Sequence, residues 1–266
     1  MPDPSAVSPS DWCLPEFRSE VFAGRSSRHA LVIPVLNEGE RIRNQLIAIT
    51  ASAADVDVVI ADGGSTDGAL DAEFLQTQRV RAVLTKTGEG RLSAQLRMAY
   101  AWCLREGYEG IVTVDGNGKD GVDAITTFVD RLDAGFDYVQ GSRNLPGGIS
   151  VNTPLDREIG NRWVHAPLLS LASGYRLTDT TNGFRAYSAR FLTDPRVAPF
   201  RDVFMRYELL FYLTVRAGQL GYRICEIPVS RRYPDAGPTP TKISGIGPKL
   251  DLLTQTVRAA LGQYAP

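Results

Sequence analysis

Short apolar runs alternate with longer amphipathic stretches through the first half of the chain. The runs are rich in β-branched residues and nearly continuous, as is typical of strands buried on both faces of a parallel sheet. They cover residues 29–35, 55–62, 79–85, 110–115 and 136–142. Helical stretches lie between them, at 39–53, 68–78, 90–106 and 121–134. This order predicts an α/β fold with a mostly parallel open sheet flanked by helices, in which ligands bind at the carboxyl ends of the strands.

The second half of the chain contains two apolar stretches of helical character. Residues 204–213 predict a buried helix, with Glu208 as its unusual acidic member. The stretch 246–261 carries an apolar stripe at helical spacing, which is more typical of a core or dimer contact than of a membrane anchor. The stripe consists of Ile246, Leu250, Leu253, Val257 and Leu261.

Polar residues gather after three of the predicted strands. Because the carboxyl ends of parallel strands meet at one edge of a sheet, we expect these residues to converge on one crevice. Asp62 and Asp67 could instead make a turn and a helix cap, two roles that Asp performs well. The three segments read Pro34-Val35-Leu36-Asn37-Glu38, Asp62-Gly63-Gly64-Ser65-Thr66-Asp67-Gly68 and Asp115-Gly116-Asn117-Gly118-Lys119-Asp120.

Composition and missing motifs disfavour several functional classes. The chain has 29 Lys and Arg against 30 Asp and Glu, so its net charge of -1 gives no reason to expect nucleic acid as a partner. No G-x-G-x-x-G follows the first strand and no P-loop motif occurs, which disfavours dinucleotide binding and P-loop chemistry. The only histidines are His29 and His165, so a histidine-rich metal site or a Ser-His-Asp triad is not expected, and His165 is interpreted as a packing or capping residue.

Three observations bear on location. The three cysteines form no C-x-x-C pair, which fits a reducing compartment. The first residues, MPDPSAVSPSDW, lack the charged and apolar regions of a signal peptide. No apolar stretch approaches the roughly 18 residues that span a bilayer. We therefore expect a cytoplasmic protein that at most lies against the inner face of a membrane.

The loop after the fourth strand has the character of a metal and phosphate site. Asp115 is followed two residues later by Asn117, and both could present oxygen to Mg²⁺ or Mn²⁺. Such an ion commonly binds substrate phosphates as well, and it would neutralise a diphosphate leaving group. The sequence therefore predicts a divalent cation as cofactor.

Taken together, these motifs resemble the family 2 glycosyltransferases of the GT-A fold. The resemblance rests on the segments that follow the three strands and, more narrowly, on motifs similar to the dolichyl-phosphate mannose synthase branch, which cover about residues 29–243. It implies an N-terminal extension at 1–28, a GT-A domain at 29–245, and a C-terminal helix and tail at 246–266. The narrower motifs are Gly141-Ser142-Arg143, Asp179-Thr180-Thr181-Asn182-Gly183-Phe184-Arg185 and Glu226-Ile227-Pro228-Val229.

The resemblance also implies roles for single residues. Residues that should line the nucleotide site are Pro34, Asn37, Glu38, Gly63 and Ser65, with Asp62 in contact with the base. Asp115 and Asn117 would hold the metal and the diphosphate, and Arg143 and Arg185 would face the phosphates. Lys242 matches a basic residue of this branch in a Pro- and Gly-rich loop that could act as a lid.

The chain departs from the branch in the loop that carries the metal ligands. The branch usually has Asp-x-Asp followed by Gln and His, whereas here Asn117 replaces the second Asp and Lys119 replaces the Gln. One anionic ligand is lost and a cation is introduced. Either Asp120 moves in to compensate, or Lys119 takes over part of the electrostatic role of the metal.

The resemblance implies an inverting, metal-assisted transfer of a sugar from a nucleoside-diphosphate sugar to a polyprenyl phosphate or to a surface polysaccharide or other glycoconjugate. A hydroxyl acceptor would need a general base, for which Glu208 and Asp179 compete, whereas an ionised phosphate acceptor would need none. The alternative is a nucleotide-sugar-binding protein without transferase activity, which the altered loop motivates. A homodimer is a further possibility for the protein's partners.

Overall fold

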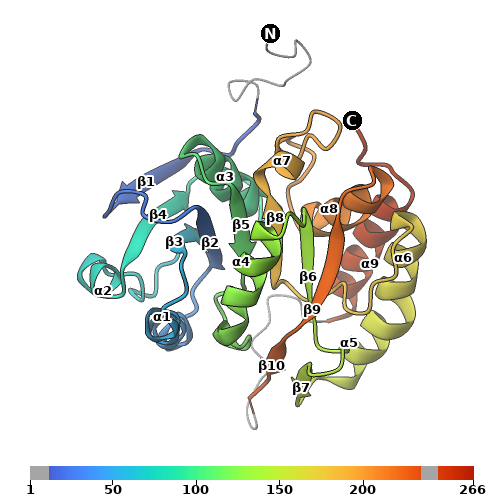
Figure 1. The fold of residues 1–266 in the computed structure, drawn as a ribbon, viewed down its shortest axis with the longest axis horizontal. Helices are drawn as coiled ribbons and strands as arrows, with labels where there is room; N and C mark the ends of the chain where they lie inside the picture. The colour runs from blue at the N-terminus through green and yellow to red at the C-terminus, as the bar shows by residue number, and fades with distance from the viewer. Residues whose placement is uncertain (1–11, 235–244) are drawn as a thin grey trace.

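The computed structural model describes residues 12–234 and 245–266, built around a central sheet of eight strands (Figure 1). The strand order is β1-β4-β3-β2-β5-β8-β6-β9, and all strands except β1 and β8 run parallel to one another. The predicted mostly parallel open sheet is therefore confirmed. The strands are β1 Phe17–Val21, β2 His29–Val35, β3 Asp57–Asp62, β4 Val80–Lys86, β5 Gly110–Thr113, β6 Tyr138–Ser142, β8 Arg185–Ser188 and β9 Ile224–Pro228.

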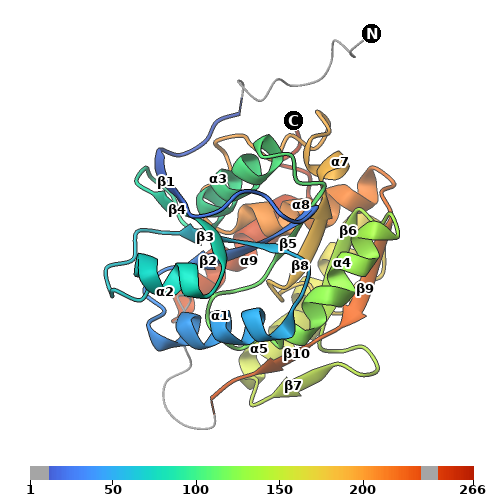
Figure 2. The same cartoon turned by 60° about the vertical axis from the view of Figure 1, so that its left-hand side comes forward.

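Helices cover both faces of this sheet. In the first half of the chain they are α1 Glu40–Ser52, α2 Ala72–Thr77, α3 Leu92–Arg105 and α4 Ile125–Asp133. In the second half they are α5 Leu155–Gly160, a π-helical turn Asn161–His165, α6 Ala166–Ser173, α7 Ala189–Leu192, α8 Glu208–Gln219 and α9 Ile246–Ala260. A small parallel sheet, formed by β7 Ile149–Val151 and β10 Ser230–Arg232, lies beside α5 (Figure 2).

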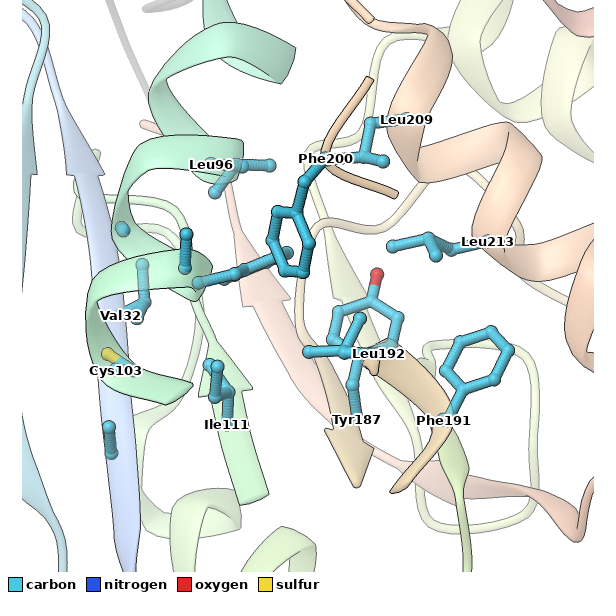
Figure 3. Close-up of a cluster of buried hydrophobic side chains, with 14 of the residues drawn as sticks. Val32, Leu96, Cys103, Ile111, Tyr187, Phe191, Leu192, Phe200, Leu209 and Leu213 are labelled. Carbon is cyan, nitrogen blue, oxygen red and sulfur yellow. The ribbon is translucent and has the colours of Figure 1, made fainter. Parts of the chain in front are cut away.

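The strand alternation divides the core into two layers. Val32 of β2, Leu96 of α3 and Leu213 of α8 belong to one cluster on one face, which Figure 3 shows together with Tyr187 of β8. Leu31, the neighbour of Val32 in β2, points to the other face and joins the cluster of α1, α2 and α4. Successive side chains of a strand point to opposite faces, so a strand buried on both sides needs a continuous apolar run. For this reason, the parallel strands could be predicted from the sequence.

Several element boundaries differ from the prediction. The helix predicted at 68–78 begins only at Ala72, because Asp71 caps it by accepting a hydrogen bond from the Phe74 amide at 2.9 Å. The helix predicted within 204–213 begins at Glu208 and continues to Gln219. Part of the predicted N-terminal extension, β1, pairs antiparallel with β4 at the edge of the sheet.

The predicted apolar stripe of α9 is not the face through which this helix packs against the core. Leu250, Val257 and Leu261 are exposed, while the helix packs against α6 and α8 through a different face that includes Leu252 and Ala259. The true packing face also contains buried Gln255 and Thr256, so its polar members hid it from a count of apolar positions. Within residues 12–234 and 245–266, no helix combines the length and apolar character needed to cross a bilayer.

Candidate active site

A cavity of about 780 Å³ opens at the carboxyl ends of the parallel strands. Pro34 at the end of β2, Gly63 after β3 and Asp115 after β5 all line it, so the three strand ends converge as expected. Among its charged lining residues, nine are Lys or Arg and three are Asp or Glu. That surplus of positive charge favours an anionic ligand, in contrast to the near-neutral chain as a whole.

The residues predicted to bind substrate divide into two groups. Those that line the cavity are Pro34, Glu38, Gly63, Asp115, Asn117, Lys119, Arg143 and Arg185. Those that do not line it are Asn37, Asp62, Ser65, Asp179 and Glu208. Lys242 lies outside the described residues.

Three residues of the second group, Asn37, Asp62 and Ser65, lie at the ends of β2 and β3 or in the loops that follow them. The Asn37 amide donates to Ser65 Oγ at 3.0 Å, and Asn37 Oδ1 accepts from the Thr66 amide at 2.7 Å. Asp62 is 4% exposed and accepts a hydrogen bond from the Ser65 amide at 2.9 Å, as in the turn considered above. Their contact with a nucleotide stays a prediction.

The turn after β5 is held from both ends by one helix side chain. Gln45 of α1 donates to the Asp115 carbonyl at 3.0 Å and accepts from the Gly118 amide at 3.0 Å. Gly118 has φ +68°, a left-handed conformation that favours glycine. Gly183 lies so close to this turn that a Cβ atom there would stand 2.5 Å from Asp115 Oδ1. The position of Asp115 is thus fixed by two distant segments.

Arg231 of β10 bridges two carboxylates beside this turn. Its Nη2 lies 3.1 Å from Asp115 Oδ2 and its Nη1 lies 2.5 Å from Asp120 Oδ2. Burial would raise the pKa of Asp115, but the charges of Arg231 and Lys119 outweigh it and hold that pKa below its usual range. Burial raises the pKa of Asp120 despite the charge of Arg231. Arg231 was not predicted from the sequence, although two arginines that follow the Glu226–Val229 motif after Ser230 were a signal for it.

Lys119 and two arginines surround the ring of Tyr233. Lys119 Nζ lies 4.9 Å from the ring centroid, and the guanidinium carbons of Arg231 and Arg157 lie 5.7 Å and 6.0 Å from it. All four residues line the cavity. Burial, together with the charge of Arg231, lowers the pKa of Lys119 to about 8. Arg157 and Tyr233 were also missed by the sequence analysis, because neither belongs to a recognised motif.

Arg143 is paired with Asp179. Its Nε and Nη2 atoms donate to the two carboxylate oxygens at 2.6 Å and 2.8 Å, and its backbone amide donates to the same carboxylate at 3.1 Å. Asn161 of the π-helical turn adds a fourth hydrogen bond to Asp179 at 3.0 Å. Because Asp179 is fully buried and saturated with donors, it is a poor candidate for a general base.

The guanidinium of Arg185 is also committed to the protein. It is 1% exposed and donates to the carbonyl oxygens of Thr180, Asn182 and Leu210 and to Thr214 Oγ1 at 2.6–3.0 Å. These contacts favour a role in holding loop 180–184 against α8. The predicted contact between Arg185 and a phosphate stays a prediction.

Glu208 lies at the start of α8 and is 7% exposed. Its Oε2 accepts a hydrogen bond from the Arg206 amide at 2.6 Å. Tyr207, Leu210 and Phe211 around it line the cavity, whereas Glu208 does not. Neither predicted general base therefore faces the cavity in this structure.

The far end of the cavity is apolar. Its wall comes from three helical segments and consists of Val164 and His165 of the π-helical turn, Leu210 and Phe211 of α8, and Leu250, Leu252 and Leu253 of α9. His165 stacks on Phe211 with ring centroids 5.9 Å apart, and its Nδ1 lies 3.1 Å from Thr256 Oγ1, consistent with the predicted packing role. At the rim, Lys249 of α9 forms an ion pair with Asp156 of α5 at 2.6 Å.

The residues predicted to hold a divalent cation do not by themselves form a cation site. Among the described residues, no group of three or more His, Cys, Asp and Glu side chains is arranged to hold an ion. Asp115 Oδ2 already accepts hydrogen bonds from Arg231 and from Asn117 Nδ2, the latter at 3.3 Å. The side-chain oxygen Oδ1 of Asn117 instead accepts a hydrogen bond from the Lys119 amide at 3.3 Å. The expected Mg²⁺ or Mn²⁺ therefore stays a prediction that this donor set does not favour.

The mostly parallel sheet and the cation-lined cavity at its strand ends fit the GT-A fold that the sequence motifs predicted. The family model for glycosyl transferase family 2 matches residues 30–194, and the chain belongs to that family. Its relatives include the polyprenol monophosphomannose synthase of Mycolicibacterium smegmatis, 28% identical over 208 residues and 77% of each chain. The undecaprenyl-phosphate mannosyltransferase of Micrococcus luteus is 29% identical over 202 residues, 75% of this chain and 81% of that protein.

Comparison with solved structures supports the same fold. Glucosyl-3-phosphoglycerate synthase from Mycobacterium tuberculosis, in complex with Mn²⁺, UDP-glucose and glycerol 3-phosphate, superposes with a TM-score of 0.55. The superposition covers 88% of this chain and 79% of that chain at 16% identity. Other structures of that synthase contain Mg²⁺ and UDP. At this identity the comparison establishes the fold of the present chain and leaves its ligands to be argued from its own residues.

Proposed function

We propose that the protein transfers a sugar, with inversion, from a nucleoside-diphosphate sugar to a polyprenyl phosphate. The observation that carries this proposal is that the two ends of the cavity differ in character. One end is cationic near Asp115, and the other is apolar between the π-helical turn, α8 and α9. A donor diphosphate and an acceptor phosphate suit the cationic end, and an isoprenoid chain suits the apolar end. Two relatives are named for transfer of mannose to polyprenol or undecaprenyl phosphate, which supports the same pair of substrates.

In this proposal the donor lies along the strand ends. The nucleoside occupies the part of the cavity lined by Pro34, Glu38 and Gly63, while the diphosphate points toward Lys119 and Arg231. Asp62, Asn37 and Ser65 support this part by fastening the loops after β2 and β3 to each other. Asp115 would then lie beside the diphosphate, since it forms an ion pair with Arg231.

The reaction is a single displacement. An oxygen of the acceptor phosphate attacks the anomeric carbon, the bond from that carbon to the donor diphosphate breaks, and the nucleoside diphosphate leaves with the bonding electrons. An acceptor phosphate is already ionised near neutral pH, so no proton has to be removed. The position of Glu208 and Asp179 outside the cavity lining fits such an acceptor better than a hydroxyl.

We also propose that the α5 side of the molecule rests against a membrane, where a polyprenyl phosphate would be located. Leu155, Ile159 and Trp163 are spaced four residues apart and are 74%, 57% and 72% exposed. An exposed apolar face of a helix is typical of interfacial binding. This face adjoins the rim of the cavity at Asp156 and Arg157, so an acceptor could enter from the lipid. Sedimentation with phospholipid vesicles should retain wild-type protein, and Trp163→Asp should release it.

The proposed function is tested by supplying purified protein with a panel of UDP-, GDP- and TDP-sugars and three acceptors. The acceptors are a polyprenyl phosphate, the matching polyprenol without phosphate, and a soluble glycan panel. We expect a glycosylated lipid phosphate, detected by mass spectrometry, with the first acceptor only. Glu208→Gln should transfer at nearly the wild-type rate.

Other outcomes would redirect the proposal. Transfer to the polyprenol or to a glycan, together with a loss of about a hundredfold or more in Glu208→Gln, would identify a hydroxyl acceptor and a general base. Nucleotide binding without transfer to any acceptor would favour the nucleotide-sugar-binding alternative.

A further inference from the structure

We propose that Lys119, Arg157 and Arg231 form a fixed cationic site for the donor diphosphate, and that this site replaces a divalent cation in sugar transfer. The inference rests on the proposed function, since it concerns how that donor is held and how its leaving group is stabilised. It predicts a transferase that works when divalent cations are removed.

The first argument is the orientation of the Asn117 amide. Asn117 Nδ2 faces Asp115 Oδ2 at 3.3 Å, and Asn117 Oδ1 faces the Lys119 amide at 3.3 Å. Turning the amide over would set its oxygen against a carboxylate oxygen and its NH₂ group against an N–H donor. Both new contacts would be repulsive, so the present orientation is the stable one. In it, Asn117 does not offer its oxygen beside Asp115 to a metal, which binds through oxygen.

The second argument concerns Asp120, the carboxylate that could have replaced the missing ligand. Its side chain is fully buried and points to Arg231 Nη1 at 2.5 Å. The backbone around it is fastened to β10, because the Gly121 amide donates to the Ser230 carbonyl at 3.0 Å and the Arg232 amide donates to the Lys119 carbonyl at 2.8 Å. Oδ2 of Asp120 is therefore engaged by Arg231, and these backbone contacts hold the carboxylate in that position, with its Oδ1 buried and without a hydrogen-bond partner among the described residues.

The third argument is the gathering of three cations around one aromatic ring. Lys119, Arg157 and Arg231 each lie within 6.0 Å of the Tyr233 centroid, and all three line the cavity next to Asp115. Like charges so close together repel one another, and a bound polyanion relieves that repulsion. Lys119 and Arg231 are 5% and 6% exposed, so the surrounding protein weakens their interaction with a diphosphate less than bulk water would.

Lys119, Arg157 and Arg231 would thus supply the positive charge that a divalent ion otherwise supplies. The negative charge that develops on the leaving diphosphate is met by cations that are already in position, which is the electrostatic role a metal would perform. A divalent ion beside Asp115 would instead be repelled by Arg231 at 3.1 Å from the same carboxylate and by Lys119.

The test measures nucleoside-diphosphate binding by calorimetry and sugar transfer by product formation, each in EDTA and in excess Mn²⁺. We expect wild-type binding and turnover to differ by less than about threefold between the two conditions. Lys119→Gln should weaken binding in EDTA by about tenfold, the loss typical of one charge-assisted hydrogen bond. Arg196→Gln, which removes an exposed arginine paired with Asp194 away from the cavity, is the matched control and should bind as wild type.

A variant that is expected to acquire a requirement for a divalent cation provides a second test. Asn117→Asp combined with Lys119→Gln restores the acidic pair and removes one cation, without leaving a buried carboxylate unpaired. We expect this double variant to require Mn²⁺ for nucleotide binding and transfer. Arg231→Gln is less informative because Asp120 would lose its buried partner and the variant could fail to fold.

The outcomes separate the inference from the function on which it rests. Wild-type binding and transfer that are lost in EDTA and restored by Mn²⁺ would overturn the inference while leaving the proposed function intact. Unchanged nucleotide affinity in Lys119→Gln would also overturn it. Absence of nucleotide binding in both conditions would contradict the proposed function itself, and the inference with it.

Discussion

The two ends of the cavity are built in different ways. At the cationic end, the loop carrying Lys119 and Asp120 is fastened to β10 by backbone hydrogen bonds, and Arg231 is fixed by two carboxylates. At the apolar end, the lining side chains come from three separate helical segments and are mostly aliphatic or aromatic, with His165 paired to Thr256 behind them. One end is therefore fixed by directional contacts, and the other is mainly packed.

This difference suits the ligands proposed for the two ends. Electrostatic stabilisation depends on the distance and orientation of each charge, so the groups must be held in place before the ligand arrives. Burial of an apolar chain is not directional and is roughly proportional to the area removed from water. An apolar slot between helices is sufficient for a long isoprenoid, while a diphosphate requires fixed cations. The predictions below separate these two contributions.

The largest effect should come from breaking the ion pair that supports the cationic end. Arg143→Met leaves Asp179, which is fully buried, without its bidentate partner. We expect a loss of about 3–5 kcal/mol in the free energy of unfolding, measured by urea denaturation. The double variant Arg143→Met, Asp179→Leu should recover most of that loss. A change below about 1 kcal/mol in the single variant would mean that the pair is not needed for stability.

A charge introduced at the apolar end should affect the acceptor alone. Leu250 lines the cavity and is 58% exposed, so Leu250→Asp should fold normally. We expect the KM for polyprenyl phosphate to rise about tenfold, the equivalent of losing one buried aliphatic contact, with unchanged nucleotide affinity by calorimetry. Ile47→Asp, at an exposed apolar position of α1 outside the cavity, should have no effect. Reduced nucleotide affinity in Leu250→Asp would show that the two ends are not independent.

A change in ionic strength should have a smaller effect, and it should act on nucleotide affinity rather than on the apolar contact. Raising the ionic strength from about 0.05 M to 0.5 M shortens the screening length severalfold, so nucleotide affinity should fall by about two- to fivefold. The ratio of KM values for a short-chain and a long-chain polyprenyl phosphate should stay constant, since it reports the apolar contact. A ratio that changes as much as the nucleotide affinity would contradict the assignment of the chain to the apolar end.

The smallest effect should come from His165, whose side chain packs at the apolar end of the cavity. Burial lowers the pKa of His165 below the value of 6.5 expected in the unfolded chain. The unfolded state therefore binds a proton more tightly, and stability should fall as the pH drops below about 6.5, by at most about 1.4 kcal/mol per pH unit from this group. His165→Gln should flatten that slope between pH 6.5 and 5.5 in urea unfolding. Identical slopes in both proteins would assign the pH dependence to other groups.

The parallel part of the fold could be predicted because its signals are local. The continuous apolar runs of β2 to β5 follow from burial on both faces, and they identified each strand to within a few residues. The antiparallel strand β8 was not predicted. It has four residues, and it lies between β5 and β6 because of pairings with strands more than 40 residues away in the chain, such as that of Arg185 with Gln140 and with Thr113. The pattern of apolar and polar residues within Arg185–Ser188 does not indicate where this strand lies in the sheet.

The residues of the site could likewise be predicted only where the signal is local. Asp115, Asn117 and Lys119 were predicted together since they occupy one loop at a strand end, and the motif resemblance identified the family. The contacts of Arg143 and Arg185 could not be predicted, because a motif gives a residue type and not the partners that burial selects for it. Arg231 was missed for a related reason. Its two carboxylates precede it by 111 and 116 positions, and only the closed fold brings them together.

That separation along the chain also bears on how the protein is made. During synthesis from the N-terminus, Asp115 and Asp120 leave the ribosome more than a hundred residues before Arg231 does. The strands β2 to β5 pair over shorter spans and can assemble first, while closing the longer loop costs more chain entropy. Until β10 is made, the nascent protein lacks both Arg231 and the backbone contacts that join β10 to the loop carrying Asp120. The cationic end of the cavity is therefore expected to be among the last parts of the protein to form, and a chain interrupted before residue 231 would contain all eight strands of the central sheet but lack Arg231 and Tyr233.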